Sequence, residues 1–417
     1  MLWMMTAMPE IKPRPRWRVA RIAMYGALTL GVAWALFVAV TEIRVARTFG
    51  AIRQDGFQTN LSELSPPFAS AEENGAWLYT AACAVRRSKG YVSVSLRPHL
   101  RDLSSAEREA LNLAAKDNQA ALALLHEARL KPTCSFRRNY AAASAFQPDV
   151  PEFGPSMILA SLLSYEAQVL AASGDHAQAR ERACDLFALA DAFRHDPNAL
   201  SQLARLNIAM TGVDLVRECT AVAESRDLEE WLKTLPPPEQ FGTVEFALRA
   251  ELARLTTAVR APISYLTSHD NEGPISGTVN YVFVAPLFKA YSVDSLQRLH
   301  RLVRVAGRPY PDLKAELDAL FPESICGGRR DFDLVDVNLS ARTLIRDHAV
   351  AVAALAVARA GVQVEILRAR DGVYPAAVDV ADPFGGGPLV LQGGVIRSVG
   401  PTGYTSNREL LEWTLRR

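Results

Sequence analysis

Cysteine is scarce in this sequence of 417 residues, and none of its five cysteines belongs to a Cys-x-x-Cys pair or lies at metal-ligand spacing from a histidine. The usual signatures of a zinc site and of a thioredoxin-like redox pair are therefore excluded. Cys83, Cys184 and Cys219 occupy apolar helical positions, where a cysteine commonly serves as a small buried hydrophobic residue. Cys134 and Cys326 lie in connecting segments, and a disulfide between these two is left open.

The short motifs of common active sites are also missing. The sequence has no G-x-S-x-G elbow, no H-E-x-x-H helix, no phosphate-binding G-x-x-x-x-G-K-[ST] loop and no G-x-G-x-x-G after a strand. Two polar groups of residues are candidate sites. Asp331, Asp333 and Asp336 could supply oxygen ligands to a hard cation. Tyr265, His269 and Asp270 lie together in an interior loop. A solvated linker and a polar loop give the same patterns, so no catalytic, cofactor-binding or metal-ligating residue is assigned.

The charged residues are not gathered into one basic face. The net charge is only +1, and the 39 arginines, which far outnumber the 7 lysines, alternate with acidic residues along helical stretches. A nucleic-acid partner requires a basic face or stripe. The composition therefore argues against nucleic-acid binding.

One apolar run is long enough to cross a membrane. Residues 22–40 are uncharged and almost wholly apolar, and 19 helical residues just cover a hydrocarbon core of roughly 30 Å. Basic residues precede the run, whereas Glu42 and Asp55 dilute those that follow it, so the positive-inside rule places the N-terminus in the cytoplasm. The preceding basic residues are Lys12, Arg14, Arg16, Arg18 and Arg21. We expect a signal anchor in a bacterial inner membrane, with a signal peptide cleaved near residues 33–35 as the alternative.

The remainder has helical periodicity from about residue 70 to residue 370, so the chain is expected to be mainly α, with less than about a tenth in strands. The spanning helix should continue as an amphipathic stretch over 42–64, and one helix should extend from Ser104 or Ser105 to residue 130. Residues 156–172 and 176–195 resemble one hairpin of a tetratricopeptide-type array, although no 34-residue period exists. The apolar segment 281–288 either covers the helical core or forms a patch for a partner or a membrane.

A final helix of about thirty residues should end at Asp371-Gly372, with the stretch 349–358 as a core helix rather than a second span. After it, a β-hairpin is expected about Gly393-Gly394, whose apolar residues cover the helix. A helix followed by G-x-Y-P, D-P-F-G and a strand ending at S-x-G resembles the globular part of type II secretion major pseudopilins, over about the last 65 residues. The prepilin leader and the calcium loop of that family are absent, so neither processing nor calcium binding is carried over.

Other segments are similar to uncharacterised, membrane-anchored helical proteins of planctomycetes and myxobacteria, and this resemblance implies no activity. These segments are "EENGAWLYTAA", "KPTCSFRRNY" and "GDHAQARERACDLFALADAFRHDPNALSQLARLNIA".

The expected organisation has four parts: a basic cytoplasmic segment, a transmembrane helix, an extracytoplasmic helical domain, and a long helix carrying a small β subdomain. Their bounds are 1–21, 22–40, 41–337 and 338–417. The function expected from it is a single-pass envelope scaffold or protein-interaction module, with the lipid bilayer and an envelope protein as partners. The alternative is an extracytoplasmic hydrolase whose site is assembled around residues 262–285.

Overall fold

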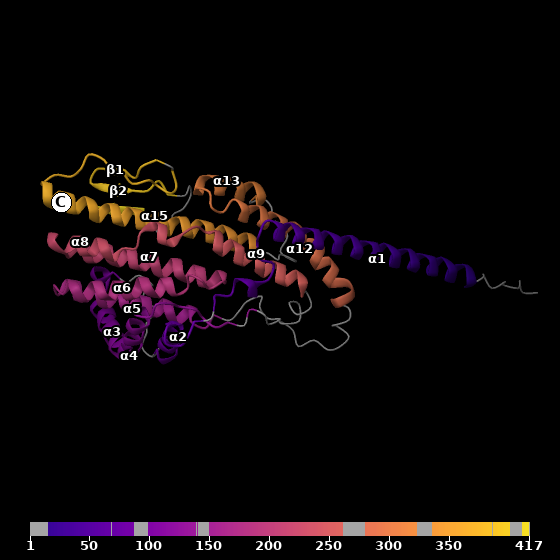
Figure 1. Cartoon of the computed structure of the whole chain (residues 1–417), viewed down its shortest axis with the longest axis horizontal. Helices are drawn as coiled ribbons and strands as arrows, with labels where there is room; N and C mark the ends of the chain where they lie inside the picture. The colour runs from indigo at the N-terminus through magenta and orange to yellow at the C-terminus, as the bar shows by residue number, and fades with distance from the viewer. Residues whose placement is uncertain are drawn as a thin grey trace, which may run out of the picture.

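The computed structural model describes residues 16–67, 69–86, 99–138, 140, 150–261, 280–322, 336–385, 387–400 and 411–416. Within these ranges 72% of the residues are helical, in 12 α-helices and a few short turns, and one antiparallel sheet has three strands. The expected content of mainly helix with little strand is confirmed for this part of the chain. The molecule is elongated, and its first helix projects from one end (Figure 1).

The α-helices and strands follow one another in a simple order along the chain. The helices are α1 (Arg16–Gln54), α2 (Ala76–Val85), α3 (Ser105–Asp117), α4 (Gln119–Arg129), α5 (Phe153–Ala172), α6 (His176–Ala192), α7 (Ala199–Val222), α8 (Ser225–Thr234), α9 (Glu245–Arg260), α12 (Ala285–Arg304), α13 (Tyr310–Leu320) and α15 (Asp336–Asp371). The strands are β1 (Val390–Gln392), β2 (Val395–Arg397) and β3 (Glu412–Thr414).

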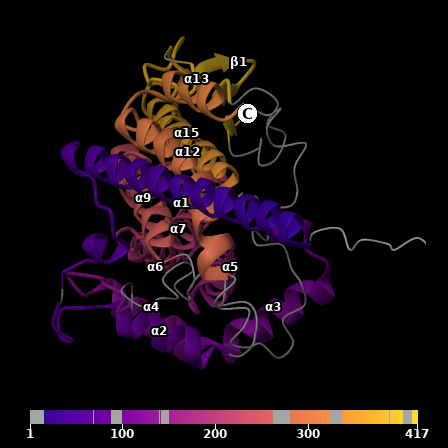
Figure 2. The ribbon, with the colours of Figure 1, turned by 90° about the vertical axis from the view of Figure 1, so that its right-hand side faces the viewer.

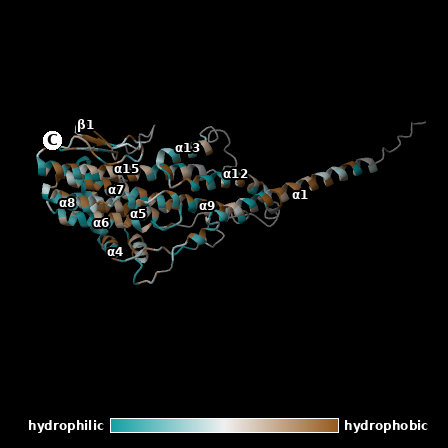
Figure 3. Cartoon of the chain, turned by 45° about the horizontal axis from the view of Figure 1, so that its top comes forward, coloured by the Kyte–Doolittle hydropathy of each residue, from teal (hydrophilic) through white to brown (hydrophobic). Residues whose placement is uncertain are grey.

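Helix α1 contains the apolar run. Its apolar part, Ala20–Gln54, is long enough to span a membrane, and many of its large hydrophobic side chains are exposed; much of the projecting ribbon is brown (Figure 3). An N-terminal apolar helix that could serve as a membrane anchor is therefore present. The helix ends at Gln54, and Gly56 turns the chain at a φ of 80° that favours glycine. The expectation of a continuing amphipathic helix to residue 64 was thus wrong beyond Gln54, where only the 3-10 turn η1 (Leu61–Leu64) follows.

The first of two main cores lies among α5, α6, α7, α8 and α15, with α2 and α4 packed against it. The expected hairpin is confirmed: Gly174 has a φ of 87° at the end of α5, and the Asp175 carboxylate accepts a hydrogen bond of 3.1 Å from the Gln178 backbone N–H to cap α6. Helices α6 and α7 can approach closely because Gly212 of α7 has no side chain. A Cβ at this position would lie 2.6 Å from the ring of Phe187 in α6. Seen end-on, α2, α3 and α4 lie on the side opposite the small sheet (Figure 2).

One expected helix is in fact two. Ser104 caps α3 through a full capping box with Glu107, as the sequence indicated. The predicted single helix to residue 130 was wrong, because Asn118 leaves the helical conformation with φ −106° and ψ 11°. Its buried amide donates a hydrogen bond of 2.8 Å to the Ala114 carbonyl oxygen, an interaction that competes with the helical ladder.

The second core joins the end of α1 to α9, α12, α13 and the beginning of α15. Val45 and Ile52 of α1 are buried in it, so the C-terminal part of α1 belongs to the folded body. Helix α15 passes through both cores: Ala341, Leu344 and Ile345 belong to the second core, and the stretch 349–358 is buried in the first. The latter stretch is therefore a core helix, as expected.

The tail forms the sheet β1-β2-β3 on α15. The hairpin about Gly393 and Gly394, whose φ values are 60° and 76°, is confirmed, whereas β3 was not foreseen. Trp413 of β3 packs so closely on Gly361 of α15 that a Cβ there would lie 2.3 Å from the indole ring. Of the apolar tail residues expected to cover the helix, four are fully buried and three are partly buried. The buried ones are Val378, Phe384, Leu389 and Ile396, and the others are Tyr374, Leu391 and Val395.

Candidate functional site

A groove with a volume of about 730 Å³ lies on the side of the molecule that carries α2 and α4. Tyr79 of α2 and three segments line it: residues 66–67 and 69–73 before α2, residues 128–135 at and after the end of α4, and residues 188–195 at the end of α6. We call this hollow the groove. It is larger than two other hollows, of about 410 and 360 Å³, and it combines apolar and charged walls.

Two of the three walls are tied together by backbone hydrogen bonds. Asn74 and Thr133 form a parallel β-bridge, in which the Gly75 N–H donates to the Thr133 carbonyl oxygen at 2.8 Å. The Asn74 side chain adds a reciprocal pair with the Ser135 backbone, at 2.9 Å in each direction. Gly75 is required at this point because a Cβ there would lie 2.8 Å from the Ala128 carbonyl oxygen. These two walls are therefore held in a fixed position relative to one another.

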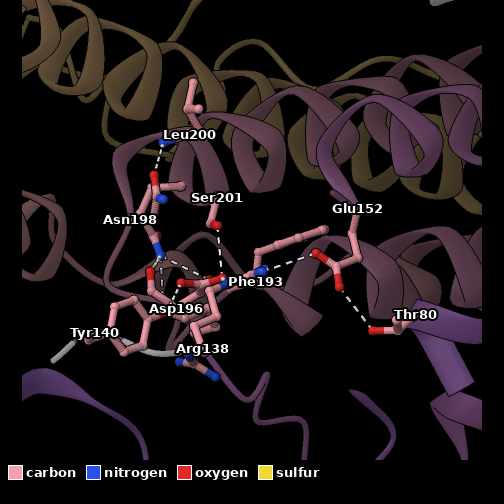
Figure 4. A network of polar contacts seen from close by, with 11 residues as sticks. Thr80, Arg138, Tyr140, Glu152, Phe193, Asp196, Asn198, Leu200 and Ser201 are labelled. Carbon is pink, nitrogen blue, oxygen red and sulfur yellow. Dashed lines mark hydrogen bonds and ion pairs between the residues drawn. The ribbon is translucent and has the colours of Figure 1, made fainter. Parts of the chain in front are cut away.

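A buried ionic network anchors the chain that leaves the groove. Arg138 donates through Nε to Asp196 Oδ2 at 2.6 Å and through Nη1 to Glu152 Oε2 at 3.1 Å, and the side chains of all three are at most 7% exposed (Figure 4). Hydroxyl groups complete the network: Tyr140 donates to Asp196 Oδ1 and Thr80 to Glu152 Oε1, and Ser201 donates to Asp196 Oδ2, which also accepts from Arg138. The Ser201 and Thr80 bonds measure 2.9 and 3.0 Å.

Among the described residues the network has one cation, Arg138, for two carboxylates, so the charge balance of the network depends on Arg138. Burial alone would lower the pKa of Arg138, but the charges of Asp196 and Glu152 outweigh this effect and raise the pKa above its usual value. The guanidinium is thus fixed in its charged form. We assign the network a positioning role, because it joins the segment after the groove to α5 and to the beginning of α7.

A second ionic cluster lies beside the groove. The fully buried carboxylate of Asp185 contacts His126 Nδ1 at 3.1 Å and Arg129 Nε at 3.0 Å, and Arg129 also pairs with Glu181. Burial raises the pKa of Asp185, and the charges of Arg129 and His126 oppose this rise. Arg129 reaches the groove, so its side chain is held in place from behind by two carboxylates.

Three titratable groups on the groove walls, those of Cys134, Tyr79 and His195, are held in neutral forms at neutral pH. Burial raises the pKa of the Cys134 thiol to about 12 and the pKa of the Tyr79 hydroxyl above its usual range. Burial, and then the charge of Arg194, lowers the pKa of His195 below 6.5. A protonated thiol is a poor nucleophile. The groove is therefore suited to binding through hydrogen bonds, apolar contact and its fixed cations.

The hollow of about 410 Å³ has a structural explanation. It lies between α7, α15 and β3, and two of its charged residues, Glu365 and Arg416, hold the end of the chain. The Arg416 backbone N–H donates to Glu365 at 2.6 Å, and the Arg416 guanidinium donates to the Ala223 carbonyl oxygen at 2.8 Å.

The structure reaches few of the residues that the sequence singled out as sites. Tyr265, His269, Asp270, Asp331 and Asp333 lie outside the described residues, and so does Cys326, whose disulfide with Cys134 was left open. Asp336 begins α15. Within the described ranges no group of three or more His, Cys, Asp or Glu side chains is arranged to hold a metal ion.

Sequence reasoning missed the groove and the network beneath it. Arg138 and Tyr140 belong to "KPTCSFRRNY", and Asp196 belongs to "FRHDPNAL", both of which were quoted only for their resemblance. Charged and aromatic residues inside Pro-bearing connections were the available signal. No protein-family model, no curated protein and no solved structure matches this chain.

Proposed function

We propose that this protein is a single-pass component of a bacterial cytoplasmic membrane whose helical domain, outside the cytoplasm, binds a partner protein in the groove. The observation that carries the proposal is the groove itself, with walls fixed by the Asn74–Thr133 bridge and the Arg138 network. A preformed concave surface loses little conformational entropy on binding, which favours recognition over mere packing.

The side chains on the walls indicate the kind of partner segment. Lys131 forms no ion pair within the described part of the chain, and Arg129 and Arg194 add positive charge against Glu73 and Asp191. Small residues on the α4 and α6 walls leave room for a main chain. They are Ala128, Ala188 and Ala192. We therefore infer an extended partner segment with small apolar residues and an acidic side chain opposite Lys131.

Photo-crosslinking tests the groove directly. A benzophenone amino acid at position 131 should give a discrete protein adduct in native membranes, because its side chain lines the groove. The same amino acid at Lys116, an exposed lysine on α3, should give none. Adding Ala188→Trp should abolish the adduct by filling the groove, whereas Ala123→Trp, at an exposed α4 position, should not. Equal adducts from positions 131 and 116 would contradict the proposal.

The orientation of the anchor is a second test. A reporter that is active only outside the cytoplasm, fused after Arg417, should be active, because basic residues flank the cytoplasmic side of the 22–40 run. The protein should also stay with the membrane in high salt and in alkali. Activity of a cytoplasmic reporter at the same position would reverse the orientation, and a mature N-terminus near Leu36 would replace the anchor with a cleaved signal peptide.

Two finer likenesses belong to the same proposal. The α5–α6 hairpin supports a tetratricopeptide-like unit in the interaction module. A long helix, a turn organised by Asp382 and a small antiparallel sheet support a pseudopilin-like tail. The Asp382 carboxylate accepts hydrogen bonds from the Phe384 N–H, the Ser398 hydroxyl and the Val399 N–H, at 2.7 to 2.9 Å. The alternative function, a hydrolase assembled around residues 262–285, has its polar residues outside the described ranges.

A further inference from the structure

Helix α12 packs against α9 of the domain and also against α1, the proposed membrane anchor (Figure 1). The two helices are parallel and in register over a long distance. Toward the C-terminal ends of both helices, Gln297 Nε2 donates to Thr48 Oγ1 at 3.2 Å, and His300 contacts Asp55 at 3.0 Å. At the N-terminal end of α12, the short π-helical turn η4 (Asn280–Val284), which precedes it, contacts Trp34 of α1.

The lower contact lies within the apolar run of α1. Trp34 Nε1 donates to the Val282 carbonyl oxygen at 3.2 Å, and the rings of Trp34 and Phe283 are 5.4 Å apart. Trp34 precedes Val40, the end of the apolar run, by a segment roughly 9 Å long at the ordinary helical rise. If residues 22–40 span the bilayer, Val282 and Phe283 must lie at the depth of Trp34, below the membrane surface.

Both helices change from apolar to charged residues at the same level, after Val40 in α1 and after Phe288 in α12. On the N-terminal side of that level, Val282, Phe283 and Leu287 are 40–53% exposed although they are large and hydrophobic, and Leu36 and Val40 of α1 are 61% and 55% exposed. On the C-terminal side of that level, two ion pairs join the helices, Lys289 to Glu42 at 2.6 Å and Arg44 to Asp294 at 2.8 Å. Tyr291, at the level of these ion pairs, is also exposed, and tyrosine is enriched at membrane surfaces.

The chemistry of this apolar face matches lipid rather than water. Residues 280–288 contain no charged side chain. The helical turn of η4 and the bond from Trp34 satisfy backbone groups that hydrocarbon could not. The face is also continuous with the exposed apolar surface of α1, which is the surface assigned to the bilayer. Exposed patches of large apolar residues commonly mark such contacts.

We infer that η4 and the first turn of α12, residues 280–288, insert into the bilayer leaflet adjoining the helical domain and form a second membrane contact beside α1. The occupant of the Val282, Phe283 and Leu287 face is the acyl region of the lipid. The inference rests on the proposed role of α1 as a membrane span. It adds that the domain itself is embedded, where the proposed function requires only a tether.

Lipid photo-crosslinking of the full-length protein tests this. A benzophenone amino acid is placed at Phe283 or at Leu287, in vesicles of phosphatidylethanolamine and phosphatidylglycerol. The expected result is a covalent adduct with phospholipid at both positions, with a yield close to that of the same amino acid at Leu30 of α1. Val222, an exposed apolar residue at the end of α7, is the matched control and should give no lipid adduct.

The outcomes separate the two proposals. Lipid adducts at Leu30 but at neither Phe283 nor Leu287 would overturn the second contact and leave the membrane span standing. Adducts from Phe283 to a second protein chain instead of lipid would also overturn it, because the face would then be a protein interface. The absence of lipid adducts at Leu30 would refute the membrane span and, with it, the inference. Two reporting positions protect the result against a variant that fails to fold.

Discussion

Replacing Arg138 with alanine should lower the free energy of unfolding by about 3–5 kcal/mol, the usual cost of removing one partner from a buried ion pair. The variant leaves the carboxylates of Asp196 and Glu152 buried without their cation, 1% and 7% exposed. The measurement is the thermal or urea-induced unfolding of the full-length protein in detergent, followed by the helical circular dichroism signal.

Two further variants control this result. Arg226→Ala removes an arginine that is 79% exposed in an ion pair with Glu224, and it should change the stability by less than about 1 kcal/mol. Asp196→Asn preserves the shape of the side chain and leaves Arg138 paired one-to-one with Glu152, so its loss should be smaller than that of Arg138→Ala. If Arg138→Ala costs no more than Arg226→Ala, the network does not stabilise the fold as described.

Replacing Trp413 with alanine should cost about 3–5 kcal/mol and lower the melting temperature of the whole domain. Trp413 is 4% exposed and lies directly on the backbone of Gly361 in α15, so the variant opens a cavity between the tail and the core helix. Trp77→Ala is the matched control, because Trp77 is half exposed and should cost clearly less.

Gly361 supplies the complementary test of this contact. Gly361→Ala should itself destabilise, by about 1–3 kcal/mol, because the new methyl group would clash with the indole ring. In the double variant the added methyl group occupies part of the space left by the indole, so the two losses should not add. An unchanged melting temperature for Trp413→Ala would instead make the tail an independent appendage of the domain.

The sequence was most informative where a single strong pattern determined the structure. The uncharged run of α1, the long apolar face of α15 and the Gly393-Gly394 turn each carry an unambiguous local signal. The break at Asn118 was missed because the helical periodicity continues unchanged across it. Strand β3 was missed because three residues, Glu412–Thr414, are too few to show an alternating pattern.

The candidate site was beyond sequence reasoning for a different reason. Arg138 and Asp196 are separated by 58 residues, and they meet only because α5 and α6 fold back between them. In a chain with 39 arginines, the burial of one of them is decided by tertiary packing, and no local pattern distinguishes it. The groove follows from the same packing, because its three walls come from segments distant in sequence.

Helix α1 continues without interruption from Arg16 to Gln54, and its last turns are built into the second core through Val45 and Ile52. The proposed membrane segment and the domain therefore lie on one continuous helix, with no flexible joint between them. A quarter-turn of the anchor within the bilayer would carry the groove through the same angle, and a partner that twisted the anchor would transmit torque to the domain. Such a coupling is unavailable to a protein whose domain hangs from its anchor by a flexible linker.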